Sequence, residues 1–484
     1  MTAQWRRQMP ALPSGIKNIH LIGICGTGMG ALAGMLKASG YEVRGSDRGA
    51  YPPMSLWLAD RGIDIMPGYK AEHLQWGPDL VIVGNVARRD NPEAVEALRL
   101  GLASISFPEA IRAFFLKGKR PLVVTGTHGK TTTSAILAWL LESAGLRPGF
   151  MIGGVTGNFG SNFKLDDGEV FVIEGDEYDS AYFDKVPKFW HYEPAVATIN
   201  NVEFDHADIY PNLEEISMVF ERFARMLPAD GQLWVNGDDA RAVAATAAAA
   251  CPVRRFGMGP DNDLRPTHVE HTSTGVIMDL ELDGQSLGRF ESPMPGEHNV
   301  RNFMGALALA MSQGVSPDQA RAALPGFTSV KKRQELKGKP SGVWVYDDFA
   351  HHPSAVRETL QAIRARHPKA RLWAAFEAKS NTSRMAIFQD DYPQAFDGAD
   401  AVLLSAPWRQ KSPEGGRKSI DLNQVVSDLQ AMQIDAQLIP DVEDIIQHLA
   451  ARVKPGDVIL GMSGSSFSGF HDRMIAAINA LSPQ

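Results

Sequence analysis

Short apolar runs alternate with helix-like segments along almost the whole chain. The first run, NIHLIGIC, leads through glycines into a helical pattern and then into a second run that ends at Asp47. The same order of run, loop and helical pattern recurs at DLVIVGNVA, PLVVTGT, EVFVIEGD, AVATINN, VWVYDD, RLWAAFE and DVILGMS. Buried strands that alternate with helices are typical of parallel α/β sheets. The pattern therefore predicts an α/β fold.

Three blocks of this pattern divide the chain. The block that ends with FPEAIRAFFLKGKRP gives way to a new strand near Lys119, and another block begins near Val330 after LPGFTS. Between them, the alternating polar positions of THVEHTSTGVIMDLELDGQSLGRFESP predict antiparallel strands attached to the second block. At roughly 150 residues per domain, a chain of 484 residues also suggests about three domains. We expect domains at 1–118, 119–329 and 330–484.

Composition narrows the class of protein. A hydrophobic content of 44% is enough for real cores, and a net charge of −8 disfavours a nucleic-acid binder, whose surface would be basic. The two cysteines, Cys25 and Cys251, make no disulfide framework and fit a reducing compartment. No apolar run approaches the ~20 residues of a membrane span, and the first residues have no signal-peptide core. We expect a cytoplasmic protein that neither binds nucleic acid nor inserts into a membrane.

The stretch TGTHGKTT places two glycines and a lysine between a strand and a helix. Gly126 and Gly129 stand where the backbone must turn tightly, so that N–H groups point at one spot beside a helix N-terminus, where anions are favoured. Lys130 would reach the outer phosphates of a nucleotide, and the hydroxyl of Thr131 or Thr132 would meet Mg²⁺. The loop is shorter than G-x-x-x-x-G-K-[ST]. An ordinary strand-to-helix turn is the alternative.

Acidic residues and a histidine follow later apolar runs of the second block. Glu174, Asp176 and Glu177 lie in IEGDEYD, and His206 and Asp208 lie in NNVEFDHADIY. Ligands of open α/β sheets sit at the carboxyl ends of strands, and a magnesium–ATP site needs hard oxygen ligands. Histidine is unusual for magnesium, so a solvent-facing helix cap is the alternative for the histidine.

Another glycine loop, GICGTGMGALA, follows the first apolar run. Gly26, Gly28 and Ala31 fit G-x-G-x-x-A, and Asp47 ends the next strand, where a ribose-binding acid would sit. The loop could hold NAD or the diphosphate of another nucleotide, and the second is favoured because a separate ATP loop is present. The alternative is that the glycines only allow close packing of the helix.

Charged and polar loops follow the strands of the third block. YDDFAHHPSAV places acids and two histidines at a strand end, although a His-His-Pro sequence is more often a loop cap than a metal site. The charge run at 331–333 is either a solvated surface or a phosphate clamp. FEAKSNTSRM follows another strand with a dense set of donors suited to a carboxylate-rich ligand.

The motifs TGTHGKTTT, EGDEYD, NNVEFDHAD, GEHNVRN and DDFAHHPSAV together resemble the bacterial Mur ligases, in the family's order and spacing and across nearly the full chain. The resemblance implies a three-domain architecture: a UDP-binding Rossmann-like domain, a central P-loop ATPase domain and a C-terminal Rossmann-like domain. GICGTGMGALA with GSD is similar to the branch that joins L-alanine to UDP-N-acetylmuramate. EGDEYDSAYFDK, HYEP and FEAKSNT are more similar to the branch that joins the tripeptide L-Ala-γ-D-Glu-meso-diaminopimelate in cell-wall recycling.

Carried over motif by motif, the resemblance implies roles for particular residues. The catalytic residues would be Lys130, Glu174, His206, Arg333 and His351. The metal ligands would be Thr131, Glu174 and His206. ATP would be bound by Gly126, Thr127, His128, Gly129, Lys130, Thr131, Thr132, Asn299 and Asn302 (adenine), Arg333 (γ-phosphate) and Asp348 (ribose). The UDP substrate would meet Gly26, Thr27, Gly28, Met29, Ser46 and Asp47. The incoming peptide would meet Lys379, Ser380, Asn381, Thr382 and Arg384.

Two positions depart from the family's pattern. The helix after His206, NLEEISMVFERFARML, lacks the lysine that several Mur ligases carbamylate, so a second Mg²⁺ site is not implied. Lys379 stands where the tripeptide branch is expected to have arginine, and lysine lacks the planar fork of bidentate carboxylate recognition.

The implied reaction is ATP-dependent amide-bond formation through an acyl phosphate of UDP-N-acetylmuramate. The expected ligands are ATP, Mg²⁺, UDP-N-acetylmuramate and a short murein peptide, bound by a monomer or weak homo-oligomer. The alternatives are L-alanine as the acceptor, an NAD-dependent oxidoreductase that uses the first glycine loop, and a regulatory nucleotide-binding protein. An oxidoreductase would leave the THGKTT loop without a role.

Overall fold

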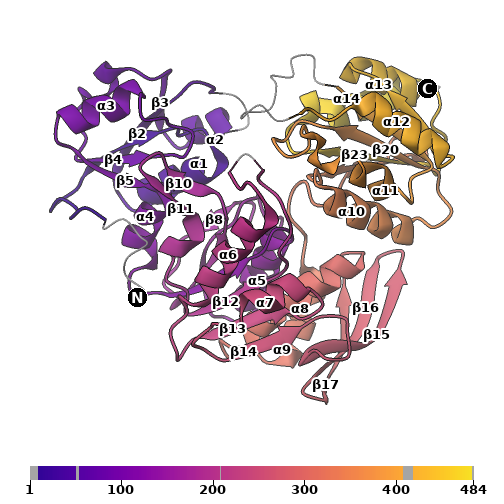
Figure 1. Cartoon of the computed structure of the whole chain (residues 1–484), viewed down its shortest axis with the longest axis horizontal. Helices are drawn as coiled ribbons and strands as arrows, with labels where there is room; N and C mark the ends of the chain where they lie inside the picture. Colours follow the sequence, from indigo (N-terminus) through magenta and orange to yellow (C-terminus); the bar gives the residue numbers. More distant parts are fainter. Residues whose placement is uncertain (1–8, 51–53, 208, 407–417, 482–484) are drawn as a thin grey trace. The chain divides into compact units, whose positions relative to one another are not determined.

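The computed structural model describes residues 9–50, 54–207, 209–406 and 418–481 (Figure 1). The candidate ligand Asp208 lies outside them. Backbone contacts divide the chain into two compact units, and each is described by itself. The first unit comprises Met1–Val202, Ile216–Asn262 and Gly305–Ala320, and the second comprises Glu203–Glu215, Asp263–Met304 and Arg321–Gln484. The segment Glu203–Glu215, which carries His206, therefore groups with the third block of the sequence.

An N-terminal parallel sheet in the first unit has the strand order β3-β2-β1-β4-β5. Its strands are β1 (Asn18–Ile22), β2 (Glu42–Asp47), β3 (Asp64–Pro67), β4 (Leu80–Val83) and β5 (Ala103–Ser106). Its helices are α1 (Thr27–Ala38), α2 (Met54–Asp60), η1 (Ala71–Leu74), α3 (Pro92–Arg99), α4 (Phe107–Ile111) and η2 (Arg112–Leu116). The strand order reverses between β1 and β4, which is where such sheets bind ligands.

A second set of strands in this unit runs in the order β14-β13-β12-β6-β9-β7-β8. The strands are β6 (Arg120–Thr125), β7 (Gly149–Met151), β8 (Phe163–Lys164), β9 (Val170–Gly175), β12 (Val196–Ile199), β13 (Gln232–Asn236) and β14 (Val253–Phe256). Around them lie α5 (Lys130–Ser143), the hairpin β10 (Asp179–Ala181) and β11 (Asp184–Pro187), η3 (Lys188–His191), α6 (Leu213–Ala224) and α7 (Ala240–Ala245). The central strand β6 is parallel to both of its neighbours, so its carboxyl end shares an edge with theirs.

The second unit contains the antiparallel strands that the alternating sequence predicts. They are β15 (Leu264–Thr272), β16 (Gly275–Leu282) and β17 (Gln285–Ser292). The helix α8 (Glu297–Met311) starts after them, and α9 (Pro317–Ala323) and η4 (Leu324–Gly326) follow along the chain.

The C-terminal sheet has the strand order β18-β19-β23-β20-β21-β22, parallel except at β18. Its strands are β18 (Glu335–Gly338), β19 (Trp344–Asp348), β20 (Leu372–Glu377), β21 (Ala401–Ser405), β22 (Asp435–Leu438) and β23 (Val458–Ser463). Its helices are η5 (Pro340–Gly342), α10 (Pro353–Arg366), η6 (Ala386–Phe388), α11 (Asp391–Ala395), α12 (Leu422–Ala431), α13 (Val442–Ala450), η8 (Phe467–Gly469) and α14 (Phe470–Leu481).

Successive side chains of the C-terminal strands enter different cores. Leu372, Ala374 and Phe376 of β20 belong to one apolar cluster, whereas Trp373 and Ala375 belong to another. This alternation places one core on each face of the sheet, as the period of two in a strand requires. The sheet is thus covered on both sides, and its loops at the strand ends are left to carry function.

The structure confirms the predicted α/β fold. Each of the two glycine loops lies between a parallel strand and a helix, β1 and α1 for the first, β6 and α5 for the second. Among the described helices, none combines the length and the apolarity that crossing a membrane requires.

Candidate active site

The loop between β6 and α5 adopts the tight turn that its sequence predicts. Gly126 has a φ of 129° and Gly129 a φ of 81°, both unfavourable for residues with a Cβ. A Cβ at Gly126 would also lie 2.9 Å from the Cβ of Asn200. Asn201 holds the loop from the neighbouring strand end, because its Oδ1 accepts the N–H of His128 at 2.7 Å. The loop is therefore fixed in shape, as a preorganised anion site must be.

Lys130 begins α5 and turns back into the loop. Its Nζ donates to the carbonyl oxygens of Gly126 at 2.6 Å and Thr127 at 3.1 Å, and to Glu177 Oε2 at 2.8 Å. Burial alone would lower the pKa of Lys130, but the charges of Glu177 and Asp176 outweigh it and raise the pKa above its ordinary value. The lysine therefore carries a positive charge beside the loop at neutral pH.

The three acids that follow β9 have different partners. Glu174 pairs in register with Val124 of β6, so it lies at the same sheet edge as the loop, and its Oε2 accepts the N–H of Gly153 at 2.6 Å. Glu177 pairs with Lys130, and Asp176 pairs with Lys188 at 2.8 Å. Burial acts to raise the pKa of Asp176, but Lys188 and Lys130 lower it to about 2.

These partners distinguish the candidate metal ligands. Asp176 and Glu177 neutralise lysines, whereas Glu174 accepts the backbone N–H of Gly153 through Oε2 at 2.6 Å. Of the two candidate hydroxyls, Thr132 is buried whereas Thr131 is partly accessible. A carboxylate and a hydroxyl beside a phosphate loop are hard oxygen donors, so Glu174 and Thr131 fit Mg²⁺.

The glycines of the first glycine loop differ in whether packing requires them. A Cβ at Gly30 or Gly34 would strike Met54 or Trp57, so these two glycines serve packing. A Cβ at Gly26 or Gly28 would meet protein atoms at 3.4 Å or more, which is ordinary contact. Packing of the helix therefore does not require glycine at Gly26 or Gly28, and their contact with a ligand stays a prediction.

The strand end beside this loop supports it. Asp47 accepts the N–H of Cys25 through Oδ2 at 2.9 Å and the N–H of Gly49 through Oδ1 at 3.0 Å, so it shapes both loops that it joins. Ser46 is fully buried, and its hydroxyl donates to Glu93. The Ser46 side chain is therefore bonded to the interior of the domain, and its role in nucleotide binding stays a prediction.

Sequence reasoning missed the acid that holds Ser46. Glu93 of α3 is fully buried, and its carboxylate lies 3.0 Å from His20 Nε2 and 2.6 Å from His73 Nδ1. Burial acts to raise the pKa of Glu93, but the hydrogen bonds from His20 and Ser46 lower it below its ordinary value. His20 and His73 are 73 and 20 residues away from Glu93 along the chain, so no local sequence pattern predicts these contacts.

In the second unit, the segment that carries His206 is bonded to the C-terminal sheet and its loops. Asp205 accepts the hydroxyl of Thr382 at 2.6 Å, and Glu203 accepts the hydroxyl of Ser354 at 2.6 Å. His206 itself has a φ of 52°, a conformation that costs free energy in a residue other than glycine and is common at functional sites. Glu174 and His206 belong to different units, so their common metal site stays a prediction.

The two histidines of the third block have separate tasks. His352 caps α10, because its Nδ1 accepts the N–H of Ser354 at 3.3 Å, while its Nε2 lies 3.2 Å from the carbonyl oxygen of Phe204. His352 therefore serves as a helix cap, as His-His-Pro suggests. His351 is half-buried, and its Nδ1 donates to the carbonyl oxygen of Phe349 at 2.9 Å; a catalytic role for it stays a prediction.

The predicted ribose and γ-phosphate residues lie together in the second unit. Asp348 accepts the N–H of Gln334 at 2.8 Å, and the guanidinium of Arg333 lies 4.9 Å from the ring of Phe349. Burial raises the pKa of Asp348, and the charge of Arg333 opposes that rise.

The predicted adenine residues at the start of α8 are buried and hydrogen-bonded in series. The side chain of Asn302 donates to Asn299 Oδ1 at 3.2 Å, and the side chain of Asn299 donates to the carbonyl oxygen of Pro295 at 2.8 Å.

The predicted peptide loop is partly internal. Asn381 is exposed and accepts Arg384 Nη2 at 2.7 Å, and Ser380 donates to Ser383 at 2.8 Å. The side chain of Lys379 is 45% exposed, and its Nζ lies 3.6 Å from Glu377 Oε1, so the charge is partly balanced but still faces solvent. Thr382 is buried and bonded to Asp205, so in this structure it ties the loop to the His206 segment rather than facing solvent.

A buried acid–histidine pair predicts the pH dependence of stability. Burial raises the pKa of Asp347 from 3.8 to about 6, and burial lowers the pKa of His471 from 6.5 to about 4; their side chains lie 3.5 Å apart. Between these values the folded pair holds its proton on Asp347, whereas the unfolded chain holds one on the histidine. The two residues therefore change the free energy of unfolding with pH in opposite directions, and in the wild type these changes offset each other.

In Asp347→Asn, His471 is the member of the pair that can still titrate. Below pH 6.5 its imidazole binds more protons in the unfolded state than in the folded state, because folding lowers its pKa. We expect the unfolding free energy of this variant, relative to wild type, to fall by about 1 kcal/mol per pH unit between roughly pH 6 and pH 4. Urea unfolding at several pH values measures this, and Asp347→Asn/His471→Gln should restore the wild-type dependence. Parallel curves for wild type and Asp347→Asn would contradict the assignment.

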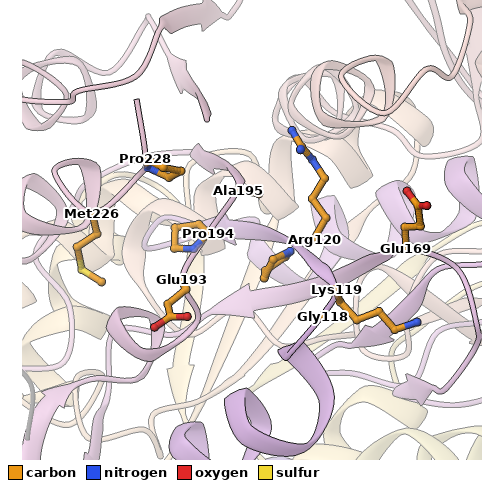
Figure 2. A pocket seen from close by; sticks show the side chains of 10 residues that line it. Gly118, Lys119, Arg120, Glu169, Glu193, Pro194, Ala195, Met226 and Pro228 are labelled. Carbon is orange, nitrogen blue, oxygen red and sulfur yellow. The ribbon is translucent and has the colours of Figure 1, made fainter. Parts of the chain in front are cut away.

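A pocket with a volume of about 700 Å³ lies away from these loops, in the first unit (Figure 2). Its lining includes Arg120, Glu169 and Ala195, which stand at or just before the starts of β6, β9 and β12. Because these strands are parallel, the pocket lies at the sheet edge opposite the phosphate loop. Ligands of such sheets bind at the carboxyl ends, so the pocket is not the candidate active site.

Comparison with known proteins shows that three successive parts of the chain match domains of one enzyme family. Residues 18–118 match the model "Mur ligase family, catalytic domain", residues 124–310 match "Mur ligase middle domain", and residues 332–465 match "Mur ligase, glutamate ligase domain". A ligase from Haemophilus influenzae is 38% identical over 462 residues, which cover 95% of this chain and 99% of that protein. The chain belongs to the Mur ligase family.

The relatives differ in the acceptor that their names give. The Haemophilus influenzae protein is a UDP-N-acetylmuramate–L-alanyl-γ-D-glutamyl-meso-2,6-diaminoheptandioate ligase. A UDP-N-acetylmuramate–L-alanine ligase from a Mycobacterium species (strain JLS) is 33% identical over 485 residues and covers 97% of both chains. The crystal structure of a murein peptide ligase from Psychrobacter arcticus superposes with a TM-score of 0.72 at 35% identity, over 97% of this chain and all of that one. The chain thus has the three-domain architecture of this family.

Proposed function

We propose that this Mur ligase joins a tripeptide, L-Ala-γ-D-Glu-meso-diaminopimelate, to UDP-N-acetylmuramate with hydrolysis of ATP to ADP and phosphate. The observation that carries the proposal is the phosphate loop with Lys130 and Glu174 at one sheet edge, in a chain most of whose length matches a ligase named for that tripeptide. The greater identity to that relative than to the L-alanine ligase supports the tripeptide as acceptor.

The proposed reaction has two transfers. A carboxylate oxygen of the muramic acid attacks the γ-phosphorus of ATP and ADP leaves, which forms an acyl phosphate. The amine nitrogen of the tripeptide then attacks the acyl carbon, loses a proton, and phosphate leaves with the former carboxylate oxygen. The backbone N–H groups of the loop and Lys130 stabilise the charge that spreads over the transferred phosphoryl group. Mg²⁺, held by Glu174, Thr131 and His206, would neutralise phosphate charge.

We assign the substrates to three domains at 1–118, 119–329 and 330–484. Gly26 and Gly28 are not required by packing, since a Cβ there would make only ordinary contacts, and this supports a role in holding the UDP diphosphate in the first domain. The exposed Lys379 and Asn381 support a carboxylate-rich peptide in the third domain, because they offer a charge and an amide to solvent. The need for ATP and a UDP-sugar supports a cytoplasmic location.

The choice of acceptor is tested by phosphate release from ATP with UDP-N-acetylmuramate and either the tripeptide or L-alanine. We expect kcat/KM for the tripeptide to exceed that for L-alanine by about 100-fold or more, because a site that binds further polar groups discriminates against an acceptor that lacks them. The reaction without acceptor gives the background hydrolysis. Greater turnover with L-alanine would move the protein to the L-alanine branch and leave the 379–384 loop unexplained.

A further inference from the structure

A buried acid–histidine cluster in the first unit has no part in the proposed reaction. It consists of Ser106, Glu109, Asp184 and His191, and each of these residues is at most 2% exposed. Ser106 and Glu109 stand at the start of α4, which follows the N-terminal sheet, whereas Asp184 begins β11 and His191 ends η3. The cluster thus joins two parts of the unit that are separate in the sequence.

The cluster offers few hydrogen-bond donors to its carboxylates. The hydroxyl of Ser106 lies 3.1 Å from Glu109 Oε2 and also 3.1 Å from Asp184 Oδ2, but it has one hydrogen to donate. The backbone N–H of Ser106 donates to the same Glu109 oxygen at 2.7 Å. Two buried acids therefore share one hydroxyl hydrogen, and burial of polar groups without a full set of hydrogen bonds costs free energy.

Two atoms of the cluster are buried and have no hydrogen-bond partner: Glu109 Oε1 and His191 Nε2. The nitrogen lies 2.9 Å from Asp184 Oδ2, yet the two groups are not aligned for a hydrogen bond. A buried polar atom left unsatisfied costs about 1–3 kcal/mol. A short N···O distance without hydrogen-bond geometry is what two ligands of one cation show.

We propose that Glu109, Asp184 and His191 bind a divalent transition-metal ion such as Zn²⁺. Their donor atoms lie within 4.8 Å of one another. Metal–ligand bonds of ~2.1 Å place two donors ~3.4 Å apart at the tetrahedral angle of Zn²⁺ and ~3.0 Å apart at the right angle of an octahedral ion such as Mn²⁺. His191 Nε2 and Asp184 Oδ2 lie 2.9 Å apart, so binding of Zn²⁺ would move them slightly apart. The double charge of the ion balances the two carboxylates, and the hydroxyl of Ser106 is placed to complete the coordination.

The donor set selects the kind of ion. One imidazole nitrogen with two carboxylates suits Zn²⁺ or Mn²⁺, whereas Mg²⁺ prefers oxygen ligands and retains several waters. The site therefore differs from the magnesium site proposed at Glu174. Because its ligands come from α4, β11 and η3, the ion would fasten the N-terminal sheet to the hairpin beside the phosphate loop.

The test is titration of the purified full chain with ZnCl₂ in buffer that contains millimolar Mg²⁺ to fill the magnesium site. We expect one tightly held Zn²⁺ per chain by elemental analysis after dialysis, and a higher thermal midpoint of unfolding. Glu109→Gln and His191→Asn should each weaken Zn²⁺ binding by about 100-fold or more, since each removes a ligand. His20→Gln, which removes another buried histidine of this unit, is the matched control and should retain the ion.

X-ray absorption of zinc-loaded wild type keeps the proposal testable if the variants fail to fold. The expected spectrum has one imidazole nitrogen and oxygen neighbours at ~2.0–2.2 Å and no sulfur. Wild type that holds no Zn²⁺ after dialysis, or whose zinc has a sulfur neighbour, would overturn the proposal. Zinc retained undiminished by folded Glu109→Gln and His191→Asn would do the same. These measurements use no activity, so they are independent of the proposed ligation.

Discussion

Lys130→Ala is expected to lower ATP-dependent phosphate release in the ligation assay by about 10³-fold or more. The side chain is the cation that α5 contributes to the phosphate loop, and its removal takes away one of the groups that stabilise the developing phosphoryl charge. Steady-state kinetics with saturating ATP measures the loss in kcat. A variant with wild-type turnover would show that Lys130 does not contact the transferred phosphate.

The same change is also expected to destabilise the fold, which the loop motif alone does not suggest. Glu177 is fully buried and pairs with Lys130, and removal of one partner from a buried pair costs about 3–5 kcal/mol. Lys130→Ala/Glu177→Gln should recover much of this stability while it remains inactive. Chemical unfolding of the two variants separates the effects. In the double variant the unpaired charge of Glu177 is gone, so a remaining loss of activity reports the role of Lys130 in catalysis.

Glu174→Gln is expected to reduce turnover by about 100-fold or more and to raise the Mg²⁺ concentration that gives half-maximal rate. The amide keeps the size of the side chain and can still accept the N–H of Gly153, but it loses the charge that attracts the ion. Turnover measured across a magnesium titration shows both effects.

The control for this variant is Glu142→Gln. Glu142 is an acid of the same unit that pairs with Lys164 and stands in none of the proposed sites. Its replacement should leave the magnesium dependence unchanged. If Glu174→Gln had the wild-type magnesium dependence, another residue would have to be the metal ligand.

The sequence by itself determined the α/β fold and the places of both glycine loops. These features are local: an apolar run forms a strand, Gly126 and Gly129 permit the turn, and the helix begins at the next residue. The functional motifs are likewise continuous stretches, so the resemblance to Mur ligases could be read from them. The matches along the chain confirm that family.

Only the tertiary structure decided which charged groups meet. Lys130 pairs with Glu177, which is 47 residues away, and Thr382 bonds to Asp205, which is 177 residues away. The tertiary structure also shows that packing requires glycine at Gly30 and Gly34 but not at Gly26 and Gly28. It further shows that Glu109, Asp184 and His191 are buried together. The spacing of residues along a chain sets neither pairing nor burial, because both depend on how distant strands and helices pack.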